Sequence, residues 1–271
     1  MRLPFNKSKI INTFIKVEKR LRFVISTLLL SFLLLFSTFF FFDKAWFFVP
    51  LFIVATYALS YFSILEDIAK IELLMLFIVP VMFTVALYFF YFLFPVRWLT
   101  RVPFIVIYAI SIYAILLTSN IFNVGVEKSL QLYRAAFSVN YFYHAVIVFL
   151  VSNILFSLRA SFITNGLLTA AVFFPLGLHL FWSIKLNLSL DKTILIYAVF
   201  NSLLLAQIAI VGSFVPFQRS IFALILTSSY YCFTGLIAAH LDNRLFKQTV
   251  REFLIVLGVV LVIAILTLSW G

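Results

Sequence analysis

The chain has 271 residues, of which 65% are hydrophobic and only 11% are Asp, Glu, Lys or Arg. This composition excludes a soluble globular fold, in which roughly 25% of residues are charged, because no soluble core could hide so much apolar surface. The net charge of +11 does not indicate a nucleic-acid partner, because the cations stand in short gaps between long apolar stretches. We therefore expect an all-α, polytopic membrane protein.

Residues 1–22 form a predicted basic amphipathic segment on the cytoplasmic side. Seven Lys and Arg residues alternate there with apolar residues at helical spacing. Such a helix lies along an anionic leaflet, and we expect it to contact lipid headgroups through Lys16, Lys19, Arg20 and Arg22. Alternatively, these charges only fix the orientation of the first span.

Residues 23–271 form a single predicted transmembrane domain of about nine helices, since about 20 residues cross the roughly 30 Å hydrocarbon core. Only Asp43 and Lys44 separate the first two spans, which indicates a tight hairpin or, alternatively, a re-entrant pair. Pro95 and Pro103 are expected to bracket the loop after the third span. The predicted spans are 23–42, 45–65, 73–94, 104–122, 135–158, 162–184, 193–217, 220–239 and 253–270.

The distribution of cations predicts the orientation. With the N-terminus inside, fifteen of the 20 Lys and Arg residues fall in inner segments and five in outer ones. Cytoplasmic loops carry an excess of Lys and Arg, so we expect the N-terminus inside and the C-terminus outside.

Neutral polar residues lie inside several predicted spans. Asn140 and His144 are four residues apart and so share one face of the fifth span. His179 on the sixth span and Asn201 on the seventh reach a similar depth. Together they form a candidate polar pocket facing the inner leaflet. The alternative is that each side chain bonds a neighbouring helix, a contact worth about 0.6 kcal/mol on average.

A polar strip separates the fourth and fifth spans. Glu127, Gln131 and Arg134 recur there at helical spacing and predict a short interfacial helix with a polar cytoplasmic edge. Over this strip and the stretch from 78 to 103, the chain resembles an uncharacterised family of polytopic membrane proteins from small-genome bacteria. The resemblance implies a bacterial plasma membrane and no catalytic residues.

No motif for a metal, a cofactor or catalysis is present in the sequence. Cys232 stands alone, and the three His residues lack zinc-ligand spacing. Every acidic residue lies in a loop or at a span end. Ion-coupled carriers usually keep ionisable groups inside the bundle, so this placement argues against that function. A prenyltransferase would need two carboxylate-rich loops for magnesium, and only Asp191 follows the sixth span.

Three functions remain open on sequence grounds. A membrane scaffold or assembly subunit, with the bilayer and other membrane proteins as partners, fits the short loops best. The alternative is binding or transport of a lipid or another small hydrophobic molecule, and the third is a prenyltransferase-like enzyme. We expect no cofactor and, on balance, no enzyme.

Overall fold

A computed structural model of the chain describes residues 18–40, 44–64, 72–95, 97–124, 131–186 and 191–267. These ranges contain no strand, and they hold nine helices long and apolar enough to cross a membrane. The prediction of an all-α bundle with nine spans is confirmed. The helices are α2 (Lys19–Ser37), α3 (Ala45–Ile64), α4 (Glu72–Tyr91), α5 (Trp98–Val124), α6 (Gln131–Ser157), α7 (Phe162–Lys185), α8 (Lys192–Gly212), α9 (Arg219–Leu241) and α10 (Lys247–Leu266).

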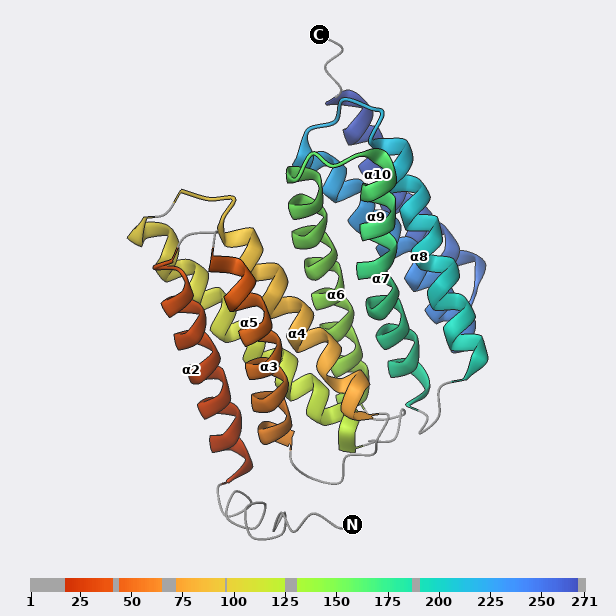
Figure 1. The fold of residues 1–271 in the computed structure, drawn as a ribbon. Helices are drawn as coiled ribbons and strands as arrows, with labels where there is room; N and C mark the ends of the chain where they lie inside the picture. The colour runs from red at the N-terminus through yellow and green to blue at the C-terminus, as the bar shows by residue number, and fades with distance from the viewer. Residues whose placement is uncertain are drawn as a thin grey trace, which may run out of the picture.

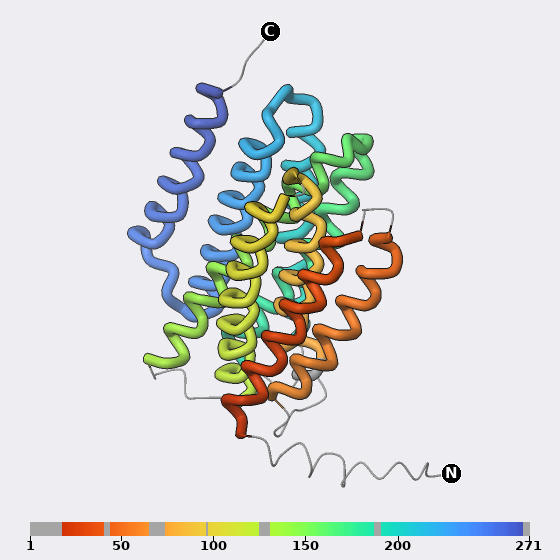
Figure 2. Tube along the Cα trace, turned by 90° about the vertical axis from the view of Figure 1, so that its left-hand side faces the viewer, coloured from red at the N-terminus to blue at the C-terminus, as the bar shows by residue number. Residues whose placement is uncertain are grey.

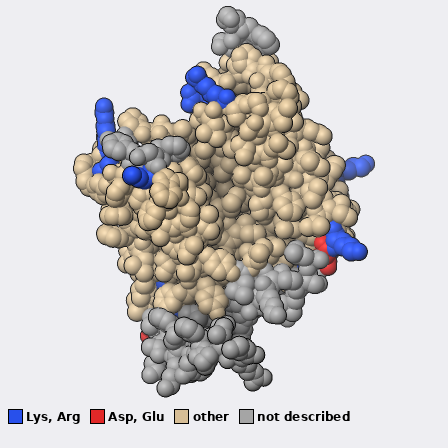
Figure 3. Space-filling view, in the orientation of Figure 1, with Lys and Arg blue, Asp and Glu red and all other residues tan. Residues whose placement is uncertain are grey.

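Successive helices run in opposite directions, so α2 begins at one end of the bundle and α10 finishes at the other (Figure 1). We call the end at which α2, α4, α6 and α8 finish the Arg101 end. The opposite end, where α3, α5, α7 and α9 finish, is the Arg134 end. Among the described residues on the face seen in Figure 3, the Lys, Arg, Asp and Glu side chains lie near the margins, as expected for helices whose flanks face lipid.

The first two spans pack as an antiparallel hairpin. Ser63 Oγ donates to Ser26 Oγ at 2.8 Å, and Ser26 Oγ donates to the carbonyl of Leu59 at 3.1 Å. These bonds join two helices of 19 and 20 residues, each long enough to cross the bilayer. The structure therefore favours the tight hairpin over a re-entrant pair.

The fourth span, α5, begins earlier than predicted. It starts at Trp98, so Pro103 lies inside the helix and does not end the preceding loop. Pro103 is the sixth residue of α5, so it removes the amide that would bond to the carbonyl of Leu99 in the second turn. Thr100 supports this start, since its Oγ1 accepts from Arg97 N at 3.2 Å and donates to the carbonyl of Pro95 at 2.9 Å.

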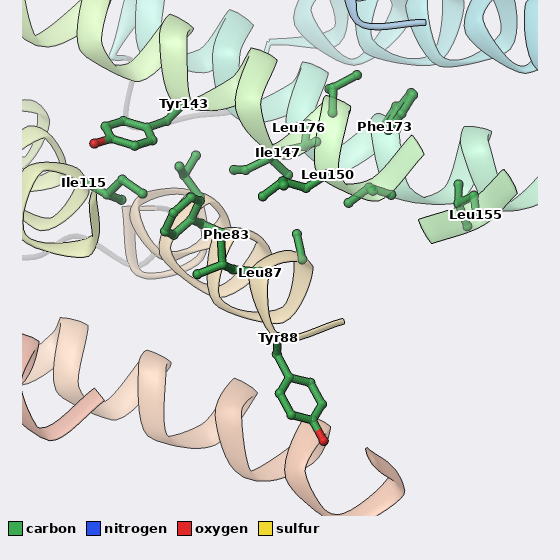
Figure 4. Close-up of a cluster of buried hydrophobic side chains, with 14 of the residues drawn as sticks. Phe83, Leu87, Tyr88, Ile115, Tyr143, Ile147, Leu150, Leu155, Phe173 and Leu176 are labelled. Carbon is green, nitrogen blue, oxygen red and sulfur yellow. The ribbon is translucent and has the colours of Figure 1, made fainter. Parts of the chain in front are cut away.

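The hydrophobic core is centred on α4. Figure 4 shows Phe83 and Leu87 of α4 directed towards Ile147 on α6. Tyr88 points the other way and packs on Phe52 of α3, with ring centres 5.0 Å apart. Of the most apolar 18-residue window in each helix, 61% is buried in α4 and in α7 but only 6% in α10. Helix α10 accordingly lies at the edge of the bundle (Figure 2).

Candidate functional site

Two of the predicted pocket residues meet inside the bundle. His144 Nδ1 lies 2.8 Å from the backbone oxygen of Asn140, and because a carbonyl only accepts, this nitrogen carries the proton. His144 Nε2 lies 3.2 Å from His179 Nδ1, within hydrogen-bond distance. The two rings stack at 20° with centres 5.1 Å apart. A buried, hydrogen-bonded histidine pair therefore joins α6 and α7.

The other two predicted pocket residues, Asn140 and Asn201, do not form a cavity with the histidine pair. Asn201 lies against Gly177, where an added Cβ would be 3.4 Å from its Nδ2. Gly177 and His179 project to nearly opposite sides of α7, because successive residues turn by about 100°. Asn140, His144, His179 and Asn201 are all exposed by 3% or less, and none lines the cavities described below. They are enclosed between packed helices, although Nδ2 of Asn140 and both polar side-chain atoms of Asn201 have no hydrogen-bond partner in the described chain.

The predicted lipid-surface cations divide into two groups. Lys16 lies outside the described residues, while Lys19 is half-buried and Arg20 is exposed in the first turn of α2. Arg22 differs from the expectation, since only 1% of its surface is exposed. It lies four residues before Ser26, which is also buried, and so belongs to the packed face of α2.

The predicted polar strip is the beginning of α6. Glu127 lies outside the described residues, whereas Gln131 and Arg134 are exposed in the first turn of that helix. In the described part of the strip, the polar edge therefore belongs to a membrane-spanning helix.

A cavity of about 710 Å³ lies at the Arg101 end, and we call it the Arg101 cavity. It is formed by the ends of α2, α4 and α6 and the starts of α5 and α7. Most of its lining is apolar, and of the described residues that line it only Arg101 is charged. The lining residues are Thr38, Phe39, Phe40, Met82, Val85, Ala86, Phe89, Phe92, Leu93, Arg101, Val151, Ile154, Leu155, Ser157, Leu158, Leu168 and Val172.

Arg101 is held in place by neutral groups. Its Nη2 donates to the carbonyl of Thr38 at 3.1 Å, and its Nε donates to the hydroxyl of Tyr91 at 3.2 Å. The guanidinium carbon lies 4.5 Å from the ring centre of Phe39 and 5.3 Å from that of Trp98. Within the described ranges no carboxylate forms an ion pair with it. A half-buried positive charge therefore lies beside an apolar space without a counter-ion from the described chain.

A second large cavity, of about 850 Å³, lies at the Arg134 end between α6, α9 and α10. Its lining includes Arg134, Arg244 and Asp242. Arg244 Nε lies 3.2 Å from Asp242 Oδ2, so one of the two cations is paired there. This cavity differs from the Arg101 cavity because its lining contains a carboxylate, that of Asp242, which pairs with Arg244.

Sequence reasoning missed Arg101 as a site residue and counted it only as a loop cation. The signal is the three-residue spacing of Trp98 and Arg101, which places both on one face of a helix. That reading requires α5 to begin at Trp98, before Pro103. Contacts with Thr38 and Tyr91 come from other helices and leave no local pattern.

Comparisons with known proteins add no relative: no family model, no curated protein and no solved structure matches the chain. The resemblance to an uncharacterised bacterial membrane family stays a prediction.

Proposed function

We propose that this protein binds a membrane amphiphile with an anionic headgroup, whose chain fills the Arg101 cavity and whose headgroup contacts Arg101. The observation that carries the proposal is the guanidinium without a carboxylate partner beside an apolar cavity. A cavity of about 710 Å³ also falls within the range of about 300 to 1,000 Å³ typical of ligand pockets.

The remaining donors of Arg101 suit a phosphate. Its bonds to Thr38 and Tyr91 use Nε and one N–H of Nη2, and a guanidinium has further N–H groups in a planar fork that can bind phosphate oxygens in pairs. Phe39 and Trp98 restrict the movement of the side chain by cation–π contact. The site is thus arranged before a headgroup arrives.

The position of the site suits a lipid taken from the bilayer. Trp98 is at the start of α5, and tryptophan concentrates at the headgroup level of membranes. In the proposed orientation, with the N-terminus inside, the Arg101 end faces the outer leaflet of a bacterial plasma membrane. The amphiphile would then enter from that leaflet.

The test is lipid binding by the purified protein, measured by native mass spectrometry with phosphatidylglycerol and phosphatidylcholine. Arg101→Gln should lower the affinity for phosphatidylglycerol by about tenfold or more, because a hydrogen bond to a charged group contributes about 1.5 to 3 kcal/mol. Binding of phosphatidylcholine should change less.

Arg97→Gln is the matched control, since Arg97 is exposed near the same end and does not line the cavity. Equal binding of both lipids by the wild type, unchanged in Arg101→Gln, would overturn the proposal. The scaffold or assembly role favoured by the sequence would then be the better account.

A further inference from the structure

We propose that a second pocket at the Arg101 end binds a phosphate monoester group. This pocket of about 350 Å³ lies between the α6–α7 and α8–α9 connections, and Arg159, Asn165, Ser213 and Arg219 line it. We call it the Arg159–Arg219 pocket. Arg101 does not line it, so the inference is independent of the function proposed above.

The first argument is charge. Both Arg159 and Arg219 are exposed and contribute a guanidinium, and no acidic residue is present in the described lining. The one protein hydrogen bond of the Arg219 side chain within the described chain is a long one of 3.5 Å, from Nη1 to Ser157 Oγ. Two cations without a carboxylate give the pocket a positive potential and leave donors for an anion.

The second argument is the start of α9, which borders the same pocket. The cap residue Gln218 makes no side-chain cap bond. The first backbone donor bonded within this helix is Phe222 N, 3.0 Å from the carbonyl of Gln218. The amides of residues 219–221 therefore lack an intrahelical acceptor, and such amides together with the helix dipole favour an anion.

The third argument is an orphaned buried oxygen. Asn165 lines the pocket and is only 4% exposed. Its Nδ2 donates to Ser213 Oγ at 3.0 Å and to the carbonyl of Ala160 at 3.4 Å, which fixes the orientation of the amide because a carbonyl cannot donate. Its Oδ1 has no hydrogen-bond partner in the described chain, although a buried acceptor normally has one.

These features together select the ligand chemistry. The guanidinium groups and free amides donate to phosphate oxygens, while Asn165 Oδ1 requires one donor from the ligand. A phosphate monoester, with a second pKa of about 6, still carries a P–OH in part of its population near neutral pH. Sulfate and phosphodiesters have no such hydrogen. The pocket therefore distinguishes a phosphate monoester from both.

The experiment uses the whole protein in detergent and in nanodiscs. Calorimetric titration with inorganic phosphate should show binding, and sulfate should bind about tenfold more weakly, as expected for loss of one hydrogen bond to a charged ligand. Arg159→Gln and Arg219→Gln should each weaken phosphate binding by about tenfold. Arg97→Gln and Arg101→Gln should leave it unchanged, which separates this site from the Arg101 cavity.

A lipid arm distinguishes the two sources of the phosphate. This arm uses the Arg101→Gln protein, so that lipid bound in the Arg101 cavity does not contribute. Nanodiscs with phosphatidic acid carry the monoester on a lipid, and nanodiscs with phosphatidylglycerol carry a diester. Binding of free phosphate, or of phosphatidic acid in preference to phosphatidylglycerol, supports the proposal. Sulfate and phosphatidylglycerol binding as tightly as phosphate and phosphatidic acid, or affinities that do not change in Arg219→Gln, would overturn it.

Asn165→Leu tests the orphaned oxygen directly. The variant should keep anion binding but lose the preference for phosphate over sulfate. Thermal unfolding verifies that it is folded, and the two exposed arginine variants decide the proposal if it is not. A preserved preference in folded Asn165→Leu would contradict the assignment of Oδ1.

Discussion

The polar side chains of the histidine pair inside the bundle and of the Arg101 cavity at its end differ in their burial and in their hydrogen-bond partners. His144 and His179 are buried and joined to each other and to a backbone carbonyl. Arg101 is half-buried, bonded only to neutral acceptors and next to an apolar space. The polar residues at membrane depth are enclosed by helix packing, whereas the charged group with unused donors lies at the interface.

The sharpest way to break this comparison is to fill the cavity. Val172→Trp places a large ring in the Arg101 cavity and should remove most retained lipid, because protein interiors have little room to yield. Val259→Trp is the control, since Val259 is 53% exposed on α10. Lipid retention measured by mass spectrometry should fall only in the first variant. An equal fall in both would show that the cavity is not the binding site.

Much of the fold was predictable from the sequence, because apolar stretches of crossing length are a local signal. The paired face of Asn140 and His144 was also visible locally, through its four-residue spacing. The partner of His144 was not, since it depends on how α6 and α7 pack. The start of α5 was missed because Pro103 is compatible with either a loop or an early helical turn.

A second prediction tests whether His144 and His179 are hydrogen-bonded to each other. His144→Leu leaves His179 Nδ1 without its hydrogen-bond partner and should reduce the free energy of unfolding by about 1 to 3 kcal/mol. The double variant His144→Leu/His179→Leu should cost less than the sum of the two single changes, because both polar partners are then removed. Thermal unfolding in detergent measures this, and lipid affinity should be unchanged. Additive costs would mean that the two rings do not bond each other.

A third prediction compares close and open packing around α10. Gly235→Ala would place a Cβ 2.3 Å from the Phe253 ring and 2.7 Å from Tyr141 Oη, whereas nothing lies within 4 Å at Gly258. We expect Gly235→Ala to destabilise by about 1 to 3 kcal/mol through overpacking. Gly258→Ala should stabilise by about 0.5 to 1 kcal/mol through helix propensity. Thermal unfolding that shows the same sign for both would contradict this packing.

The smallest expected effect is that of Arg101→Lys. The lysine ammonium keeps the positive charge but lacks the planar guanidinium. It cannot bond to Tyr91 and Thr38 and also offer paired donors to the proposed phosphate. Affinity for phosphatidylglycerol should fall by about threefold, which is less than for Arg101→Gln and corresponds to about 0.6 kcal/mol. An affinity loss equal to that of Arg101→Gln would mean that the planar shape of the guanidinium, and not its charge, determines phosphatidylglycerol binding.

The most direct measurement of the central claim is the identity of the lipid that stays with the protein after gentle extraction from cells. Mass spectrometry of the wild type should find an anionic lipid enriched over its share of the membrane. Arg101→Gln should lose that enrichment, while Arg97→Gln should keep it. A retained lipid mixture that matches the bulk membrane in all three proteins would contradict the proposed binding site.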